Sequence, residues 1–407
     1  MSSESLVFLV HRIPYPPNKG DKIRSYHWLR FLAERYRVHL GTFVDDEEDW
    51  QYLPEIQKLC ADVCAVRLSP ARQRLLSLKG LLGGEPLSVP YYDSSVLRSW
   101  VGRKIGEEGI TRMVFFSTPM AQYAPRNGAA VRKVVDFVDV DSEKWRQYSE
   151  RHPWPMGWLY RREGERLLEF ERGVATSADA SVFVTKEEAD LFRRRAGFDD
   201  DRVKAVMNGV DTEYFCPEGN YENPYRSRGP VVVFTGMMDY WANVDAVSWF
   251  GGESFPSIRR AVDGARFVIV GARPTRQVER LASLPGIEVT GSVADVRPYL
   301  AHADVSVAPL RVARGIQNKV LEAMAMGRPV VTTSGAREGL NLSPELRKGA
   351  DTAEGFADAV LALLRSPSER ERIGTLGRTW VREHHDWART LRPVTDLIEN
   401  GGGHGRA

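Results

Sequence analysis

The chain has 407 residues, 43% of them hydrophobic and 27% charged, with a formal net charge of +2. This length exceeds one ordinary core and predicts two domains, while the near-neutral charge gives no electrostatic case for nucleic acid as a partner. No apolar run approaches the length of a membrane span, and the opening MSSESLVFLVHR lacks a basic lead and an Ala-x-Ala site. We therefore expect a first strand there and no signal peptide. We expect the three cysteines, Cys60, Cys64 and Cys216, to be reduced, because no second pair completes a zinc set.

The first half of the chain alternates short apolar strands with amphipathic helices. A helix is predicted at residues 21–35, where apolar side chains recur at helical spacing. The predicted strands are residues 6–10, 38–43, 63–68, 113–117, 133–138 and 180–185. Such alternation predicts a parallel sheet with helices on both faces.

Residues 217–230 are rich in Pro, Gly, Asn and charge, which indicates a linker. The alternation then restarts, with strands predicted at residues 231–235, 267–270, 287–290, 305–308 and 330–333. The sequence thus predicts a first domain at 1–216, a second doubly wound domain at 231–375, further helix at 376–399 and a disordered tail at 400–407. Ligands of such α/β domains bind at the carboxyl ends of the strands, so we expect the site there.

The stretch from Pro309 to Val331, PLRVARGIQNKVLEAMAMGRPVV, carries the clearest chemistry. It leaves an apolar strand and enters a helix on which Lys319 and Glu322, three residues apart, share one face. A helix start and a lysine suit a phosphate, and a carboxylate can hold two neighbouring sugar hydroxyls. The pattern indicates a nucleotide site. The alternative is a surface Lys–Glu pair without function.

This segment resembles the donor-binding motif of GT-B glycosyltransferases of family 4, which are retaining enzymes. Glu322 and the run that follows it match the motif, but Arg314 stands where the family has a first Glu that touches the donor sugar. Asn208 to Asp211 with Phe215, and Phe234 to Met238 with Asn243, also resemble the family. The resemblance implies an α/β GT-B fold, with two doubly wound Rossmann-like domains facing a central cleft and residues 376–399 crossing back to the first domain.

Position after the strands and the family resemblance together assign a donor-binding set. Its members are Gly236, Met237, Asn243, Gly271, Arg273, Gly291, Val293, Arg314, Gly315, Gln317, Asn318, Lys319 and Glu322. Many family members carry basic residues in the loop that here reads MMDYWANVD, so we assign the diphosphate to Lys319, with Arg311 or Arg314 as helpers. As alternatives, Arg273 meets only solvent and Asn318 only starts the helix.

The loop after the first strand, HRIPYPPNKGD, resembles the family's loop near the reacting centre and supplies the acceptor-side residues. These are His11, Lys19, Gly20 and Asp21. Asp21 is alternatively a helix N-cap. Lys19, Lys22 and Arg24 would make a basic entrance for a phosphate-bearing acceptor, unless they form an ordinary solvated charge cluster.

Asp139 and Asp141 end a strand expected to point toward the ligand. An Asp-x-Asp motif binds a metal in GT-A enzymes, but those have one doubly wound domain and this chain shows two. The family resemblance instead places the pair beside the donor sugar, where a carboxylate orients the acceptor or stabilises positive charge at the anomeric carbon. The alternative is a helix N-cap or a structural carboxylate. The predicted catalytic residues are Asp139, Asp141, Lys319 and Glu322.

The resemblance implies transfer of a sugar from a nucleoside diphosphate sugar to an acceptor hydroxyl with retention, with no metal and no cofactor. The Arg-Gly…Lys-x-x-Glu form, the opening HRIPYPPNKG and the segment DVDSEKW together resemble a narrower group, the sugar transferases of PEP-CTERM/exosortase systems. That resemblance implies exopolysaccharide or lipid-linked glycan assembly in the cytoplasm, with peripheral contact at the inner membrane. Residues 67–82 are either an interfacial helix or an ordinary amphipathic one. Two alternatives remain: a UDP-sugar 2-epimerase-like enzyme and a non-catalytic sugar-nucleotide binding protein. A Rossmann dehydrogenase is disfavoured, because no Gly-x-Gly-x-x-Gly turn follows the first strand.

Overall fold

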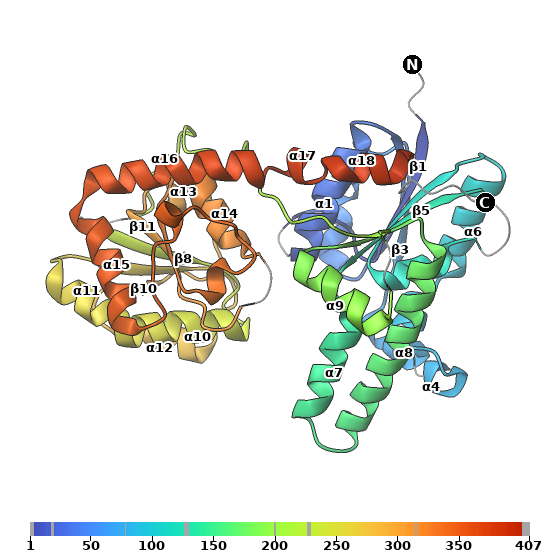
Figure 1. The fold of residues 1–407 in the computed structure, drawn as a ribbon, viewed down its shortest axis with the longest axis horizontal. Coiled ribbons are helices and arrows are strands. Elements are labelled where there is room, and N and C mark those ends of the chain that lie inside the picture. Colours follow the sequence, from blue (N-terminus) through green and yellow to red (C-terminus); the bar gives the residue numbers. More distant parts are fainter. Residues whose placement is uncertain are drawn as a thin grey trace. The chain divides into compact units, whose positions relative to one another are not determined.

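The computed structural model describes residues 4–17, 20–77, 79–125, 130–198, 201–225, 229–313 and 316–400. Two compact units make up the chain (Figure 1). The first consists of Met1–Met207 together with Leu391–Ala407, and the second consists of Asn208–Thr390.

The first unit is built on a seven-stranded parallel sheet in the order β3-β2-β1-β4-β5-β6-β7. Its strands are β1 (Ser5–Val10), β2 (Arg37–Val44), β3 (Asp62–Arg67), β4 (Arg112–Phe116), β5 (Arg132–Val138), β6 (Ala180–Phe183) and β7 (Val203–Ala205). The central strands β1 and β4 are almost continuously apolar and buried, as expected for strands covered on both faces. The six predicted strands are confirmed, and β7 is added.

The first unit also contains helices and short helical turns. They are α1 (Gly20–Ala33), η1 (Glu47–Tyr52), α2 (Leu53–Gln57), α3 (Pro70–Ser77), α4 (Lys79–Gly83), α5 (Ser88–Tyr91), α6 (Ser95–Gly106), η2 (Thr118–Tyr123), α7 (Asp141–Arg151), α8 (Met156–Ser177), α9 (Lys186–Ala196) and α18 (Arg392–Glu399). The last of them packs against β5, where the Arg132 side chain donates a 2.9 Å hydrogen bond to the Leu397 carbonyl. Helix α18 therefore belongs to the same unit as β1.

The second unit holds a five-stranded parallel sheet in the order β10-β9-β8-β11-β12. Its strands are β8 (Val231–Thr235), β9 (Arg266–Val270), β10 (Ile287–Val289), β11 (Val305–Ala308) and β12 (Val330–Thr332). Its helices are α10 (Trp241–Trp249), η3 (Phe250–Ser254), α11 (Phe255–Ala261), α12 (Arg276–Leu281), α13 (Arg297–Ala301), α14 (Asn318–Ala325), η4 (Gly335–Arg337), η5 (Pro344–Leu346), α15 (Ala353–Arg365), α16 (Pro367–His384) and α17 (Trp387–Thr390). All five predicted strands are present, with bounds within one residue of those expected.

The unit boundaries differ from the predicted domain boundaries. Residues 208–216 belong to the second unit, where the Val210 amide donates a 2.7 Å hydrogen bond to the His385 carbonyl. Residues 376–390 also stay in that unit, and the return to the first unit begins at Leu391. The described residues within 217–230 form no helix or strand.

The sequence predicts reduced cysteines and no membrane span. All three cysteines are free and partly buried. Among the residues that the structure describes, no helix combines the length and the apolar character that crossing a membrane requires.

Candidate functional site

Three glycines lie at the carboxyl edge of the second unit's sheet, where β8, β9 and β10 end. Gly236 and Gly271 have φ of 156° and 159°, and Gly291 has φ of 71°. A Cβ on Gly271 would lie 1.7 Å from the Gly236 carbonyl oxygen, so only glycine fits at that position. Three neighbouring strands therefore end in residues without side chains, which leaves their backbone accessible at the edge where ligands of parallel sheets bind.

Lys319 reaches this glycine edge from the first turn of α14. Its ammonium donates a 2.5 Å hydrogen bond to Asn243 Oδ1 and lies 4.5 Å from the centroid of the Phe234 ring. The Asn243 amide in turn donates to the Met237 carbonyl at 2.8 Å. A Cβ on Gly236 would lie 3.3 Å from Lys319 Nζ, so the four predicted donor residues Gly236, Met237, Asn243 and Lys319 lie together.

Burial tunes both charges on α14. It lowers the pKa of Lys319 to about 8, with Glu322 opposing the change. It raises the pKa of Glu322 to about 7, with Lys319 opposing. The Glu322 carboxylate accepts no hydrogen bond from any described residue, so its oxygens are free for a ligand.

The start of α14 also offers backbone donors. Its N-cap is Gln317, whose side chain makes no capping hydrogen bond, so the first N–H groups of the helix lack that partner. Asn318 is the first helical residue, and its side-chain oxygen is buried without a partner among the described residues. A helix start, a cation and an unpaired carboxylate can together bind a phosphorylated diol.

These pKa values predict a bell-shaped pH dependence for binding of a nucleoside diphosphate. Affinity should fall as pH rises through about 8, because Lys319 loses its proton, and as pH falls through about 7, because Glu322 gains one. Calorimetric titration between about pH 6 and 9 measures this profile. Lys319→Arg should abolish the alkaline decline, because a guanidinium stays charged. A flat wild-type profile would contradict the assignment.

Two other basic residues predicted at this edge, Arg273 and Arg311, are already paired. Arg273, with φ of 54°, has a side chain that is 62% exposed and pairs with Asp239 at 3.1 Å. Arg311 pairs with Asp245 of α10 through both Nε and a terminal nitrogen. Arg314 and Gly315 lie outside the described residues. Among the described residues, Lys319 is therefore the cation best placed against the glycine edge.

Tyr214 interacts with Glu322 and with Arg297, and neither Tyr214 nor Arg297 is among the predicted site residues. The Arg297 guanidinium lies 3.8 Å from the centroid of the Tyr214 ring. Burial, then Asp295 and to a smaller extent Glu322, raise the pKa of Tyr214. Val293 is partly buried on the loop between β10 and Arg297. Tyr214 lies in a loop without periodic pattern, so only its tertiary contacts reveal it.

In the first unit, His11 and Asp21 meet where β1 gives way to α1. The Asp21 carboxylate lies 3.4 Å from His11 Nε2 and 2.9 Å from the Arg12 guanidinium. Although burial opposes it, His11 and Arg12 lower the pKa of Asp21, so this carboxylate is ionised at neutral pH. Asp21 lies within the first turn of α1, directly after Gly20, and Lys19 lies outside the described residues.

The predicted basic entrance is wrong for two of its members. Lys22 is 2% exposed and its ammonium lies 2.6 Å from Asp49. Arg24 is 1% exposed and its guanidinium contacts the fully buried Asp136 of β5 at 2.7 Å and 3.2 Å. These cations are structural, because each neutralises a buried carboxylate instead of meeting a ligand.

Asp139 and Asp141 follow β5 at the same carboxyl edge of the sheet. Val138 before them has φ of 67°, and the pairing of β5 with β6 shifts register there. Lys144 of α7 donates to both carboxylates, at 2.8 Å to Asp139 and 3.0 Å to Asp141. The N-cap of α7 is Val140, so neither aspartate caps this helix. The two carboxylates are thus partly neutralised by a shared lysine.

Glu171 of α8 holds the first turn of α7 through hydrogen bonds to Ser142. Its carboxylate accepts a 2.6 Å hydrogen bond from the Ser142 hydroxyl and a 3.2 Å bond from the Ser142 amide. Burial raises the pKa of Glu171 to about 8, with Ser142 opposing. The positions of Asp139 and Asp141 therefore depend on a buried carboxyl. Among the described residues, no group of three or more His, Cys, Asp or Glu could hold a metal ion.

Comparison with known proteins agrees with this geometry. A TM-score of 0.67 at 17% identity relates the chain to sucrose-phosphate synthase from Thermosynechococcus elongatus, over 97% of this chain and 98% of that one. Anabaena HepE in complex with UDP gives 0.63 at 14% identity, over 97% and 99%. The two parallel-sheet units are the Rossmann-like domains of a GT-B fold, and the predicted fold class is confirmed.

Sequence comparison adds the family. Residues 229–366 match the family model described as glycosyl transferases group 1. The chain is 27% identical over 318 residues to a GDP-mannose-dependent alpha-(1-6)-phosphatidylinositol monomannoside mannosyltransferase of Mycobacterium tuberculosis, covering 73% of this chain and 77% of the relative. Residues 229–366, which lie within the second unit, are thus similar to glycosyl transferases group 1.

Proposed function

We propose that the protein transfers a sugar from a nucleoside diphosphate sugar to an acceptor hydroxyl with retention of the anomeric configuration. The observation that carries the proposal lies on the first turns of α14. There Lys319 lies against the glycine edge, and the Glu322 carboxylate accepts no hydrogen bond from any described residue. The match of residues 229–366 to glycosyl transferases supports it, as does the presence of UDP in the Anabaena HepE structure.

In the proposed reaction each group has one task. Lys319 and the start of α14 hold the diphosphate, and Glu322 accepts hydrogen bonds from the ribose hydroxyls. The bond between the anomeric carbon and the diphosphate breaks while the acceptor oxygen bonds to that carbon on the same face. The acceptor proton passes to the departing diphosphate, so the protein supplies position and charge stabilisation.

On the acceptor side, the proposal gives Asp139 and Asp141 the task of orienting the acceptor or stabilising charge at the anomeric carbon. Their shared bond to Lys144 holds both carboxylates in place. His11, oriented by Asp21, is proposed as a contact for acceptor hydroxyls. No metal or cofactor enters this scheme.

The anomeric configuration of the product tests this proposal. The enzyme is incubated with α-linked nucleoside diphosphate sugars and a panel of glycan and lipid-linked acceptors, and the product is examined by NMR. The proposal predicts an α-glycoside together with free nucleoside diphosphate. A β-glycoside would exclude retention. Epimerised sugar formed without an acceptor would favour an epimerase, and donor binding without turnover would favour a binding protein.

We also propose that the acceptor is a membrane-linked glycan of exopolysaccharide or related assembly, met at the cytoplasmic face of the inner membrane. The hairpin of α7 and α8 supports this, because its tip exposes Trp154 to 82% and Trp158 to 58%. Arg162 of α8 donates a 2.7 Å hydrogen bond to Gly80 of α4, which adjoins α3 with its 70% exposed Leu75. Exposed tryptophan and leucine suit a lipid interface.

Vesicle binding tests the membrane proposal. The double variant Trp154→Ser/Trp158→Ser is expected to bind anionic vesicles about tenfold or more weakly, because it removes the side chains that would enter the interface. Trp241→Ser is the matched control, since Trp241 is 54% exposed in the second unit. Co-sedimentation with phosphatidylglycerol vesicles measures both. Equal binding by the double variant and the wild type would remove the hairpin from the membrane contact.

A further inference from the structure

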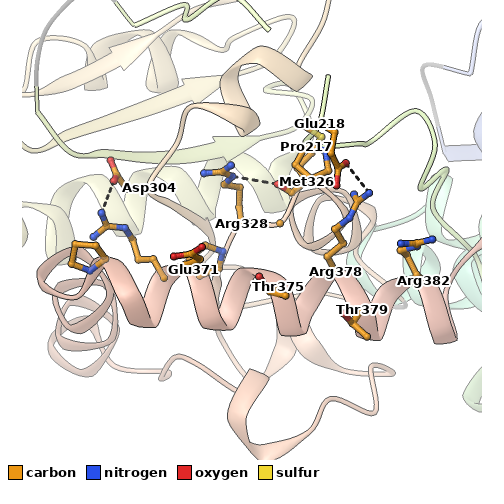
Figure 2. A pocket seen from close by; sticks show the side chains of 14 residues that line it. Pro217, Glu218, Asp304, Met326, Arg328, Glu371, Thr375, Arg378, Thr379 and Arg382 are labelled. Carbon is orange, nitrogen blue, oxygen red and sulfur yellow. Dashed lines mark hydrogen bonds and ion pairs between the residues drawn. The ribbon is translucent and has the colours of Figure 1, made fainter. Parts of the chain in front are cut away.

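The second unit contains a cavity of about 550 Å³ that the donor chemistry does not use (Figure 2). Asp304 and Pro329 in its wall directly precede β11 and β12, so it lies at the amino edge of the sheet. The glycine edge and Lys319 lie at the carboxyl edge. Met326 and Gly327, at the far end of α14 from Lys319, complete the wall, about 12 Å along the helix axis.

Four arginines line this cavity, and two of them have no carboxylate partner among the residues that the structure describes. Arg370 pairs with Asp304 at 3.1 Å, and Arg378 pairs with Glu218 at 3.0 Å. Arg328 donates only to backbone carbonyls, those of Ala303 and Met326, each at 3.3 Å.

Arg382, the fourth arginine, is exposed and makes no hydrogen bond or ion pair with any described residue. Burial lowers the pKa of Arg328, with Asp304 opposing, so its charge is poorly compensated by the protein. The Arg328 guanidinium therefore favours an anionic ligand. A phosphate group suits it, because two phosphate oxygens can accept the parallel N–H bonds of one guanidinium.

Helix α16, which carries three of these arginines, also brings hydroxyl-binding groups to the lining of the cavity. Glu371, Thr375 and Thr379 are spaced four residues apart on α16, are exposed and belong to the lining of the cavity. Glu371 has no hydrogen-bond partner among the described residues, and the two threonine hydroxyls have none either. A carboxylate with neighbouring hydroxyls suits a polyol.

The wall is built rigidly. Gly374 of α16 packs on the loop after α14, where a Cβ on Gly374 would lie 2.0 Å from the Gly327 carbonyl oxygen. Arg378 ties the same helix to the Ala325 carbonyl at 2.6 Å. None of the described lining residues is aromatic, so the cavity has no platform on which a nucleobase would stack.

We propose that this cavity is a second binding site, separate from the donor site, for a phosphorylated sugar. The phosphate lies against Arg328, with Arg382 adding positive charge at the rim, and the sugar hydroxyls bond to Glu371 and the threonines of α16. The proposal does not depend on the glycosyl transfer described above, because it uses neither the donor residues nor the first unit.

Calorimetric titration with hexose 1-phosphates, hexose 6-phosphates, inorganic phosphate and free hexose tests the site. At least one hexose phosphate should bind saturably and more tightly than inorganic phosphate, and free hexose should not bind. Arg328→Gln should weaken this binding about tenfold, and Arg382→Gln about threefold. Arg382 is exposed and has no described partner, so its replacement leaves the fold intact.

Two controls locate the ligand. Arg372→Gln changes an arginine of the same helix that pairs with Glu369 and does not line the cavity, and it should bind like the wild type. Lys319→Ala should also bind normally, which separates this site from the donor site. The proposal fails if no hexose phosphate binds, if both arginine variants bind like the wild type, if inorganic phosphate binds equally well, or if Lys319→Ala abolishes the binding.

Discussion

Replacing Lys319 with alanine is expected to weaken binding of a nucleoside diphosphate by roughly 10- to 100-fold, since a hydrogen bond to a charged group contributes about 1.5–3 kcal/mol. Lys319 contacts Asn243 and lies against the glycine edge, while Arg273 and Arg311 are held by Asp239 and Asp245. No other described cation at this edge is free to replace it. Calorimetric titration of wild type and variant at about pH 7.5, within the window that the pKa values predict, measures the effect.

Lys348→Ala is the matched control for this experiment. Lys348 belongs to the same unit, is about a third exposed and pairs with Glu369 at 3.2 Å, away from the glycine edge. Its replacement should change nucleotide affinity less than about twofold. Equal affinities of Lys319→Ala and the wild type would move the diphosphate to another cation.

Replacing Arg24 with methionine is expected to destabilise the first unit by about 3–5 kcal/mol. The reason is that Asp136, which is fully buried in β5, would lose the guanidinium 2.7 Å away and keep the Val138 amide, a neutral donor at 3.0 Å, in place of an ion pair. Burial already raises the pKa of Asp136, with Arg24 opposing. The deficit should therefore shrink as pH falls, because Asp136 can then take up a proton.

Hydrogen exchange measured by mass spectrometry resolves this effect by unit. Amides of β1, β4 and β5 should lose protection in Arg24→Met, while those of β8 and β9 serve as an internal control. The double variant Arg24→Met/Asp136→Leu should recover part of the loss, since an apolar pair leaves no buried charge. Arg35→Met, at an exposed arginine paired with Glu34, should have no effect beyond about 0.5 kcal/mol. Unchanged protection in Arg24→Met would show that Asp136 is satisfied by other groups.

Most strands of both sheets were predictable because each is a short apolar run between turn residues. Residues 231–235 and 305–308 coincide with β8 and β11. The exception, β7, has only three residues, and its Lys204 interrupts any apolar run. The unit boundaries could not be placed from composition, because residues 208–216 are held in the second unit by a tertiary hydrogen bond to His385.

For the site, spacing on one helix and glycines after strands were readable in the sequence. Lys319 and Glu322 share α14 because they are three residues apart, and Gly236 follows a clear strand. Partners far away in the chain were not readable. Asn243 is 76 residues from Lys319, and Asp136 is 112 residues from Arg24. For this reason a cation that looked available in the sequence, Arg24, is buried in the structure.

The most direct test of the donor site compares how two variants bind two different ligands. Wild type, Lys319→Ala and Glu322→Ala are titrated with the nucleotide that wild type selects from UDP, GDP and ADP, and with pyrophosphate, which has no ribose. We predict that Lys319→Ala weakens both ligands, whereas Glu322→Ala weakens the nucleotide about tenfold and leaves pyrophosphate unchanged or tighter. Absence of nucleotide binding by wild type, or equal nucleotide affinity of Glu322→Ala and wild type, would contradict the assignment of α14 as the donor site.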